Sequence, residues 1–159
     1  MKKAVTSLGL IIGLASGGAF AQQLDERDFY IGGGINVNSL SGADDSTGYQ
    51  LFAGYKMPWL DVDPFNVAVE LGYLDTGDFD FDVGGDESFS GIWANALVGY
   101  PVSRDVQFFG RAGFDFGDDD GLMFGVGAGY ALTSQLELRG EYVVRDNTNS
   151  VQANVAFHF

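Results

Sequence analysis

The chain has 159 residues, among them 24 glycines and 14 phenylalanines but no cysteine. Without cysteine a disulfide framework is excluded, so the fold has to be stabilised by packing or by closure of a sheet. The formal net charge is −14 at pH 7, from 8 basic and 22 acidic residues, and this balance excludes nucleic acid as a partner because phosphate binding needs basic surface.

The first residues have the three parts of a secretory signal peptide. Lys2 and Lys3 are positively charged, residues 4–14 form a short apolar run, and Ala19 and Ala21 fit the small-x-small cleavage pattern. The apolar run falls short of the ~20 residues that a membrane-spanning helix needs, which predicts export to the periplasm. The predicted domains are a signal peptide at residues 1–21 and one β-barrel domain at residues 22–159.

Downstream of this segment, eight stretches alternate apolar and polar residues with the period of two of an extended strand. Each is near the ~9–11 residues that a tilted strand needs to cross a bilayer. The predicted strands are residues 29–38, 48–56, 66–74, 90–100, 106–116, 122–130, 135–143 and 151–159. With apolar faces toward lipid and polar faces inward, they predict an all-β fold, an eight-stranded antiparallel up-and-down transmembrane β-barrel.

The connections between these strands divide into two sets. An even number of strands places both chain ends on one side of the membrane, as expected of bacterial barrels. With the chain starting in the periplasm, the outer links are residues 39–47, 75–89, 117–121 and 144–150, and the periplasmic links are residues 57–65, 101–105 and 131–134. This topology sorts the outward aromatic residues into two belts, as at the two interfaces of a membrane. The outer belt contains Tyr49, Tyr73, Phe114, Phe116, Phe124 and Tyr142; the periplasmic belt contains Phe29, Tyr55, Tyr100, Tyr130, Phe157 and Phe159. A soluble lipocalin-like barrel does not explain such belts.

The inward faces bring charged side chains together in the barrel interior. The predicted lumen charge network consists of Glu70, Arg111, Glu137, Arg139 and Glu141. An isolated buried charge costs several kcal/mol, so these groups have to pair, and the inward Gly125, Gly127 and Gly129 leave room for them. The network is either a gate along a narrow ion path or a polar plug that fills the barrel. Eight strands enclose only enough space for side chains, which favours the plug.

Two patterns that suggest other chemistry lack the context they need. The run Gly125-x-Gly127-x-Gly129 is spaced like a phosphate loop, but no helix and no ribose-binding acid follow it, so no cofactor is predicted. His158 is the single histidine, and no serine in a predicted strand has an evident histidine partner. We therefore predict that the protein is not an enzyme.

The predicted outer links are strongly acidic. Asp78-x-Asp80-x-Asp82 offers oxygen ligands at alternating positions and is followed by two glycines, which makes it a candidate loop for a divalent cation such as calcium. The intervening Phe79 and Phe81 and the absence of EF-hand spacing weaken this hypothesis. The favoured interpretation is a solvated surface whose charge is screened by divalent cations that also bridge it to lipopolysaccharide.

Several short stretches resemble the OmpA-like transmembrane barrel family, also called the porin-like family. They are Thr47-Gly-Tyr-Gln-Leu-Phe-Ala-Gly-Tyr55, Val69-Glu-Leu-Gly-Tyr73, Gly127-Ala-Gly-Tyr130, Leu138-Arg-Gly-Glu-Tyr142 and the terminal Phe159. The resemblance implies an eight-stranded barrel that the outer-membrane assembly machinery inserts by recognising its C-terminal strand. Phe157 and Phe159 are the expected assembly signal. Unlike full OmpA proteins, the chain is expected to stop at the barrel, without a peptidoglycan-binding domain.

The sequence therefore predicts a small bacterial outer-membrane barrel with a structural or surface-interaction role. Its expected partners are outer-membrane lipid, lipopolysaccharide and the assembly machinery, and a monomer is expected. One alternative is a narrow porin-like channel for ions or small solutes. A second is an adhesin or immune-evasion barrel of the OmpX and Ail type, against which the short acidic loops argue.

Overall fold

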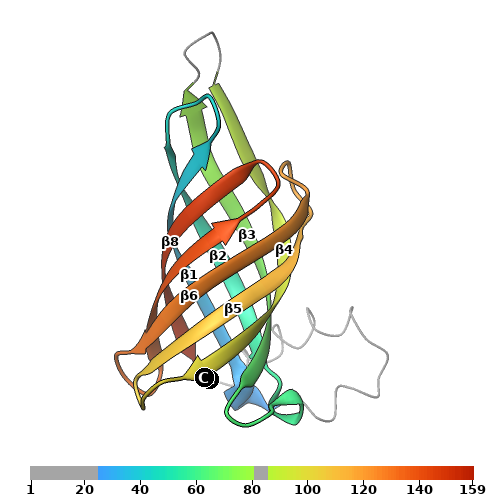
Figure 1. Ribbon diagram of the computed structural model, residues 1–159. Helices are drawn as coiled ribbons and strands as arrows, with labels where there is room; N and C mark the ends of the chain where they lie inside the picture. Colours follow the sequence, from blue (N-terminus) through green and yellow to red (C-terminus); the bar gives the residue numbers. More distant parts are fainter. Residues whose placement is uncertain (1–24, 81–85) are drawn as a thin grey trace, which may run out of the picture.

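The computed structural model describes residues 25–80 and 86–159, and the predicted signal peptide at residues 1–21 lies outside them. Within the described residues, eight antiparallel strands form one closed barrel in which each strand pairs with the next and β8 pairs with β1 (Figure 1). The predicted eight-stranded up-and-down barrel is confirmed. The strands are β1 (Phe29–Leu40), β2 (Ser46–Lys56), β3 (Asn66–Asp80), β4 (Asp86–Pro101), β5 (Val106–Asp115), β6 (Gly121–Ala131), β7 (Leu136–Val144) and β8 (Thr148–His158).

Two short 3-10 helices complete the described secondary structure. The first, η1 (Glu26–Asp28), precedes β1, and the second, η2 (Pro58–Leu60), lies in the link between β2 and β3. Neither these nor any other helix in the described part of the chain combines the length and apolarity needed to span a bilayer. Closure of the sheet pairs the backbone of each strand on both sides, as a spanning structure without helices requires in lipid.

Side chains alternate between the outer surface and the interior, as the sequence predicts. In β8, Val151 and Val155 are exposed on the outside, whereas Gln152 and Asn154 are buried. The same alternation holds in β4, where Trp93 points inward and is 0% exposed. The barrel therefore presents apolar residues outward and encloses most of its polar residues.

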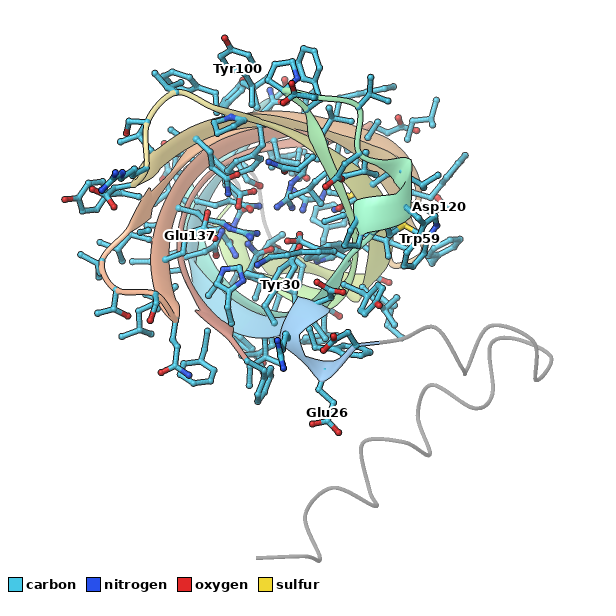
Figure 2. The ribbon with its side chains drawn as sticks, turned by 90° about the horizontal axis from the view of Figure 1, so that it is seen from below. Glu26, Tyr30, Trp59, Tyr100, Asp120 and Glu137 are labelled. Atoms are coloured by element: carbon cyan, nitrogen blue, oxygen red, sulfur yellow. The ribbon has the colours of Figure 1, made fainter. Side chains whose placement is uncertain are left out.

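The two ends of the barrel differ. We call the end at which β1 begins and β8 ends the terminal end, and the opposite end the hairpin end, because β3 and β4 rise there beyond the other strands (Figure 1). Four links lie at the hairpin end and three at the terminal end. Figure 2 looks into the barrel from the terminal end, with Tyr30 and Glu137 among the side chains that point into the lumen.

The predicted outer loop at residues 75–89 is wrong over most of its length. Both β3 and β4 continue into this segment. One bulge interrupts the pairing at Gly77, whose φ of +71° lies in the left-handed region that glycine adopts without strain. The hydroxyl of Thr76 accepts a hydrogen bond from the backbone N–H of Phe89 at 2.9 Å. Residues 78–81 alternate aspartate with phenylalanine, and this strand period outweighs their acidic composition.

Of the twelve aromatic residues in the two belts, ten are exposed on the outer surface, whereas Phe29 and Tyr55 are not. The exposed members are Tyr49, Tyr73, Tyr100, Phe114, Phe116, Phe124, Tyr130, Tyr142, Phe157 and Phe159. Tyr55 was expected among them but is only 8% exposed. Its ring packs against the rings of Phe29 and Trp59, with centroid distances of 4.6 and 5.9 Å. The periodicity predicted the face of Tyr55 but not that neighbouring aromatics cover it.

An inward glycine of β3 provides a test of how tightly the interior is packed. A Cβ added at Gly72 would overlap the indole of Trp93. We therefore expect Gly72→Ala to lower the free energy of unfolding by about 1–3 kcal/mol, measured by urea titration in lipid vesicles. A Cβ added at Gly140 would lie in open space. Gly140→Ala is therefore the matched control and should change the free energy of unfolding by less than about 0.5 kcal/mol. Equal losses in both variants would contradict this packing.

Candidate functional site: the barrel lumen

Glu70 is the hub of the lumen. Its side chain is fully buried, and its two oxygens contact different arginines: Arg111 Nη2 donates to Oε2 at 3.1 Å, and Arg139 Nη1 donates to Oε1 at 2.5 Å. The hydroxyl of Tyr30 also donates to Oε1, at 2.8 Å. One carboxylate on β3 thus connects β1, β5 and β7 across the interior.

Two further carboxylates complete the ion pairs of this cluster. Glu141 Oε2 lies 2.6 Å from Arg111 Nη2, and Glu137 Oε2 lies 3.3 Å from Arg139 Nη2. The structure therefore brings together all five residues of the predicted lumen network. Their side chains are nearly inaccessible to solvent, so each charge relies on its partners rather than on water.

His158 belongs to the same cluster at the terminal end. Its Nε2 lies 2.8 Å from Glu137 Oε2, and its ring packs at a centroid distance of 5.0 Å from the ring of Tyr30. The side-chain amide of Gln107 donates to the other oxygen of Glu137 at 2.8 Å. Glu137 thus has three polar partners, and the single histidine lies beside a lumen carboxylate.

Aromatic rings surround the two arginines and add to the polar plug that the sequence predicts. The guanidinium carbons lie 5.0–5.7 Å from four ring centroids. Arg139 lies over Tyr30, Phe52 and Phe109, and Arg111 lies over Trp93. A cation over a desolvated aromatic face is stabilised by ~2 kcal/mol. Aromatic rings therefore stabilise the two guanidiniums in addition to their ion-pair partners.

The inward glycines of β6 make room for this cluster, as predicted. A Cβ at Gly125 would lie 2.9 Å from Cγ of Arg111. A Cβ at Gly129 would overlap the carboxylate of Glu137. These positions face the long side chains of the neighbouring strands, where a larger residue would displace an ion-pairing partner.

Acidic residues at the hairpin end are not all solvated. Asp119, in the link between β5 and β6, is only 4% exposed. Its Oδ1 accepts hydrogen bonds from the backbone N–H and side-chain amide of Asn147 at 3.0 and 2.8 Å, and its Oδ2 accepts them from the backbone N–H and hydroxyl of Thr148 at 3.0 and 2.6 Å. The prediction of a solvated acidic surface is therefore wrong for Asp119. Its carboxylate connects the link between β5 and β6 to Asn147 and Thr148 through hydrogen bonds.

Arg145 is buried at the hairpin end of the lumen, near this carboxylate. Its Nε donates to Asp115 at 3.1 Å, and its Nη1 donates to the hydroxyl of Ser150 at 2.9 Å. Burial lowers the pKa of the Arg145 guanidinium, an effect that the charges of Asp115 and Asp119 oppose. A further buried ion pair, separate from the Glu70 cluster, thus lies at the hairpin end.

At the terminal end the lumen opens into a cavity of about 380 Å³, which we call the vestibule. Tyr30, Glu137, Arg139 and His158 line its inner part, and Lys56 and Arg104 line its mouth. The vestibule extends inward as far as the central ion pairs.

The remaining predicted site residues lie apart from the lumen. Phe157 and Phe159 are exposed on the outside, with ring centroids 5.4 Å apart. Of the candidate cation loop, Asp78 is exposed, whereas the side chain of Asp80 and all of Asp82 lie outside the described residues. Among the residues described, no group of three or more histidine, cysteine or acidic side chains is arranged to hold a metal ion.

Reasoning from sequence missed several buried residues of the lumen. Asn36 and Asn38 hydrogen bond to each other, and Asn38 accepts a hydrogen bond from the hydroxyl of Ser150 at 2.6 Å. Their inward position follows from the alternation in β1, which is the signal that identifies them. Asp119 and Arg145 lie in links between strands. The alternation of a strand does not extend into a link, so the sequence has no comparable signal that these two side chains are buried.

A closed antiparallel barrel with an apolar outer face, aromatic belts and an ionic lumen defines a transmembrane β-barrel. Residues 7–159 match the outer membrane protein β-barrel domain family, and the chain belongs to that family. It is a small β-barrel of the bacterial outer membrane. We expect the terminal end to face the periplasm, because bacterial barrels have short periplasmic turns and longer outer loops.

Solved structures of low sequence identity share the fold. A transmembrane β-barrel designed de novo is 20% identical, with a TM-score of 0.60 over 86% of this chain and all of that chain. Ail of Yersinia pestis in a phospholipid nanodisc is 12% identical, with a TM-score of 0.57 over 82% of this chain and 98% of that chain. Neisserial surface protein A is 16% identical, with a TM-score of 0.51 over 83% and 97%. No curated protein matches the chain.

Proposed function

We propose that this protein is a closed, non-conducting barrel with a structural and surface-interaction role in the outer membrane. The observation that carries the proposal is the buried cluster around Glu70, which bridges Arg111 and Arg139 across the lumen. Eight strands leave an interior just wide enough for side chains. The ion pairs and the rings that surround them occupy this interior, so they support a plug rather than an ion path.

The hairpin end supports the surface-interaction part of the proposal. At the hairpin end, β3 and β4 extend beyond the other strands (Figure 1), and we expect this end to face the medium outside the cell. The described part of these two strands carries the exposed Asp78, and the neighbouring link exposes Asp118 and Asp120. Acidic groups at this end attract divalent cations and, through them, the phosphates of lipopolysaccharide.

Conductance in planar bilayers tests the plug. We expect no discrete openings from the wild-type protein, because the Glu70 cluster blocks the lumen. A narrow ion path past Arg111 predicts the opposite: discrete openings in the wild type, with larger conductance in Arg111→Ala. Protein-free bilayers treated with the same detergent are the control. Discrete openings that occur only with folded wild-type protein would contradict the closed barrel.

Catalysis is not part of the proposed function. In the described part of the chain, the ring of His158 contacts Glu137 and Tyr30, and no serine is hydrogen bonded to it. A nucleophilic mechanism needs such a partner to activate the hydroxyl. We also propose a monomer in contact with lipid and lipopolysaccharide, because the barrel closes on itself without a second copy.

The aromatic end of β8 provides a test of the proposed assembly signal. Phe159 is exposed, and its backbone N–H donates to the carbonyl of Phe29 at 3.1 Å. We expect deletion of Phe159 to reduce the amount of folded protein in the outer membrane several-fold, measured by fractionation and heat-dependent gel mobility. The control is Phe116→Ala, because Phe116 is also exposed but lies at the opposite end. Normal yield after deletion would contradict the assembly role.

A further inference from the structure

The few basic residues of this acidic chain are not evenly distributed. Apart from Lys2 and Lys3, the sequence contains six. Three of them, Arg111, Arg139 and Arg145, are buried in the lumen and paired with carboxylates. The other three are Arg27, Lys56 and Arg104, in η1, at the end of β2 and in the link between β4 and β5. All three lie at the terminal end, which also carries the acidic residues Asp25, Glu26, Asp28, Asp61, Asp63 and Asp105.

Two of these cations line the vestibule. Lys56 pairs in register with Ala68 on the inward face, and both residues line the cavity. Arg104 lines it from the link between β4 and β5. Neither Lys56 nor Arg104 forms an ion pair with any residue in the ranges 25–80 and 86–159. Arg27 is the third cation of this end and does not line the cavity.

Three carboxylates also line the vestibule, those of Glu137, Asp61 and Asp105, but none of them forms an ion pair with Lys56 or Arg104. Glu137 already contacts Gln107, Arg139 and His158. Asp61 accepts a hydrogen bond from the backbone N–H of Val67 at 2.8 Å. Asp105 also lines the cavity, but no ion pair joins it to a basic residue of the described chain. Cations in a concave site attract anions more strongly than the same charges on a flat surface.

The inner vestibule adds polar and apolar groups. Arg139 is buried, and its Nε has no hydrogen-bond partner among the described residues. The same holds for Nδ1 of His158. Leu97 and Phe109 are buried apolar side chains of the wall. A cavity of about 380 Å³ is within the ~300–1,000 Å³ typical of sites for small molecules.

We propose that the vestibule binds a small organic carboxylate that enters from the periplasm. Lys56 and Arg104 attract the carboxylate at the mouth, and Leu97 and Phe109 contact the apolar body of the ligand. This binding is independent of conductance, because the vestibule ends at the central ion pairs. It adds a ligand site at the periplasmic end to a barrel whose proposed interactions lie at the outer end.

Titration of the full chain, folded in detergent micelles, tests the proposal with benzoate as the probe. The backbone amide resonances of Gly99 and Gly129 report binding because both residues line the cavity. We expect saturable shifts with benzoate, weaker binding of inorganic phosphate, and no saturable shift with neutral benzyl alcohol. Benzyl alcohol binding as tightly as benzoate would overturn the role of charge, and phosphate binding more tightly than benzoate would overturn the role of the apolar wall.

Substitution separates this site from a general attraction to the basic side chains of the terminal end. Lys56→Gln combined with Arg104→Gln should raise the dissociation constant for benzoate at least about tenfold, because both charge-assisted contacts are lost. Arg27→Gln removes a cation from the same end outside the cavity and should leave the constant within about twofold. Because all three side chains are exposed, the variants should retain the dispersed amide spectrum of the folded barrel. Equal weakening in both variants, or no weakening in the double variant, would overturn the proposal.

Discussion

Glu70→Ala is expected to lower the free energy of unfolding by about 3–5 kcal/mol, the largest effect of any single substitution considered. The change removes the carboxylate that Arg111 and Arg139 share, and with it the acceptor of the Tyr30 hydroxyl. Arg111 retains Glu141 and Arg139 retains Glu137. The loss arises because two buried guanidiniums are left with incomplete partners, and not because an ion pair is strong by itself.

Urea titration of the barrel in lipid vesicles, followed by tryptophan fluorescence, measures this effect. Glu70→Gln separates charge from hydrogen bonding, since the amide oxygen still accepts one hydrogen bond; we expect a smaller loss than for alanine. Glu26→Ala is the matched control, because Glu26 is an exposed acid in η1 and should change stability by less than about 0.5 kcal/mol. If Glu70→Ala unfolds at the wild-type urea concentration, the cluster does not stabilise the barrel.

Asp119→Ala is expected to lower the free energy of unfolding by about 3 kcal/mol. The carboxylate accepts four hydrogen bonds from Asn147 and Thr148, and two of the donors are backbone N–H groups. Removing the acceptor leaves the buried N–H of Thr148 without a partner, so its hydrogen exchange should also become faster. Urea titration and amide exchange of Thr148 measure the two consequences.

The neighbouring acid gives this prediction a close control. Asp120 adjoins Asp119 in the same link but is exposed. Asp120→Ala removes the same charge and should change stability by less than about 0.5 kcal/mol. Similar losses for the two substitutions would mean that the total charge of the link matters, and that the four hydrogen bonds of Asp119 do not.

The contrast between Asp119 and Asp120 shows where prediction from sequence stops. Both occur in a run of three aspartates, and nothing in that run distinguishes the buried member from its neighbours. Burial depends on the link between β7 and β8, which is distant in sequence and folds over Asp119. The same reason explains Tyr55, because its outward direction follows from local alternation but its cover comes from Phe29 and Trp59.

The sequence predicts which residues form the lumen network but not which of them pair with each other. Alternation along each strand depends only on the strand's own sequence, so the inward direction of Glu70, Arg111 and Arg139 was foreseeable. The partners of Glu70 lie 41 and 69 positions away in sequence. Which carboxylate reaches which arginine depends on the register and tilt of strands in the closed barrel, which local periodicity does not specify.

The sequence by itself determined the strand period, the face of each side chain, the membrane-facing aromatic belts and the residues available for the lumen. These follow from the two-residue repeat of an extended chain and from the preference of apolar side chains for lipid. Only the tertiary structure decided that Glu70 is the hub, that Asp119 is buried, and that Lys56 and Arg104 share a cavity. These features combine side chains from separate strands and links, and their distances are set only when the barrel closes.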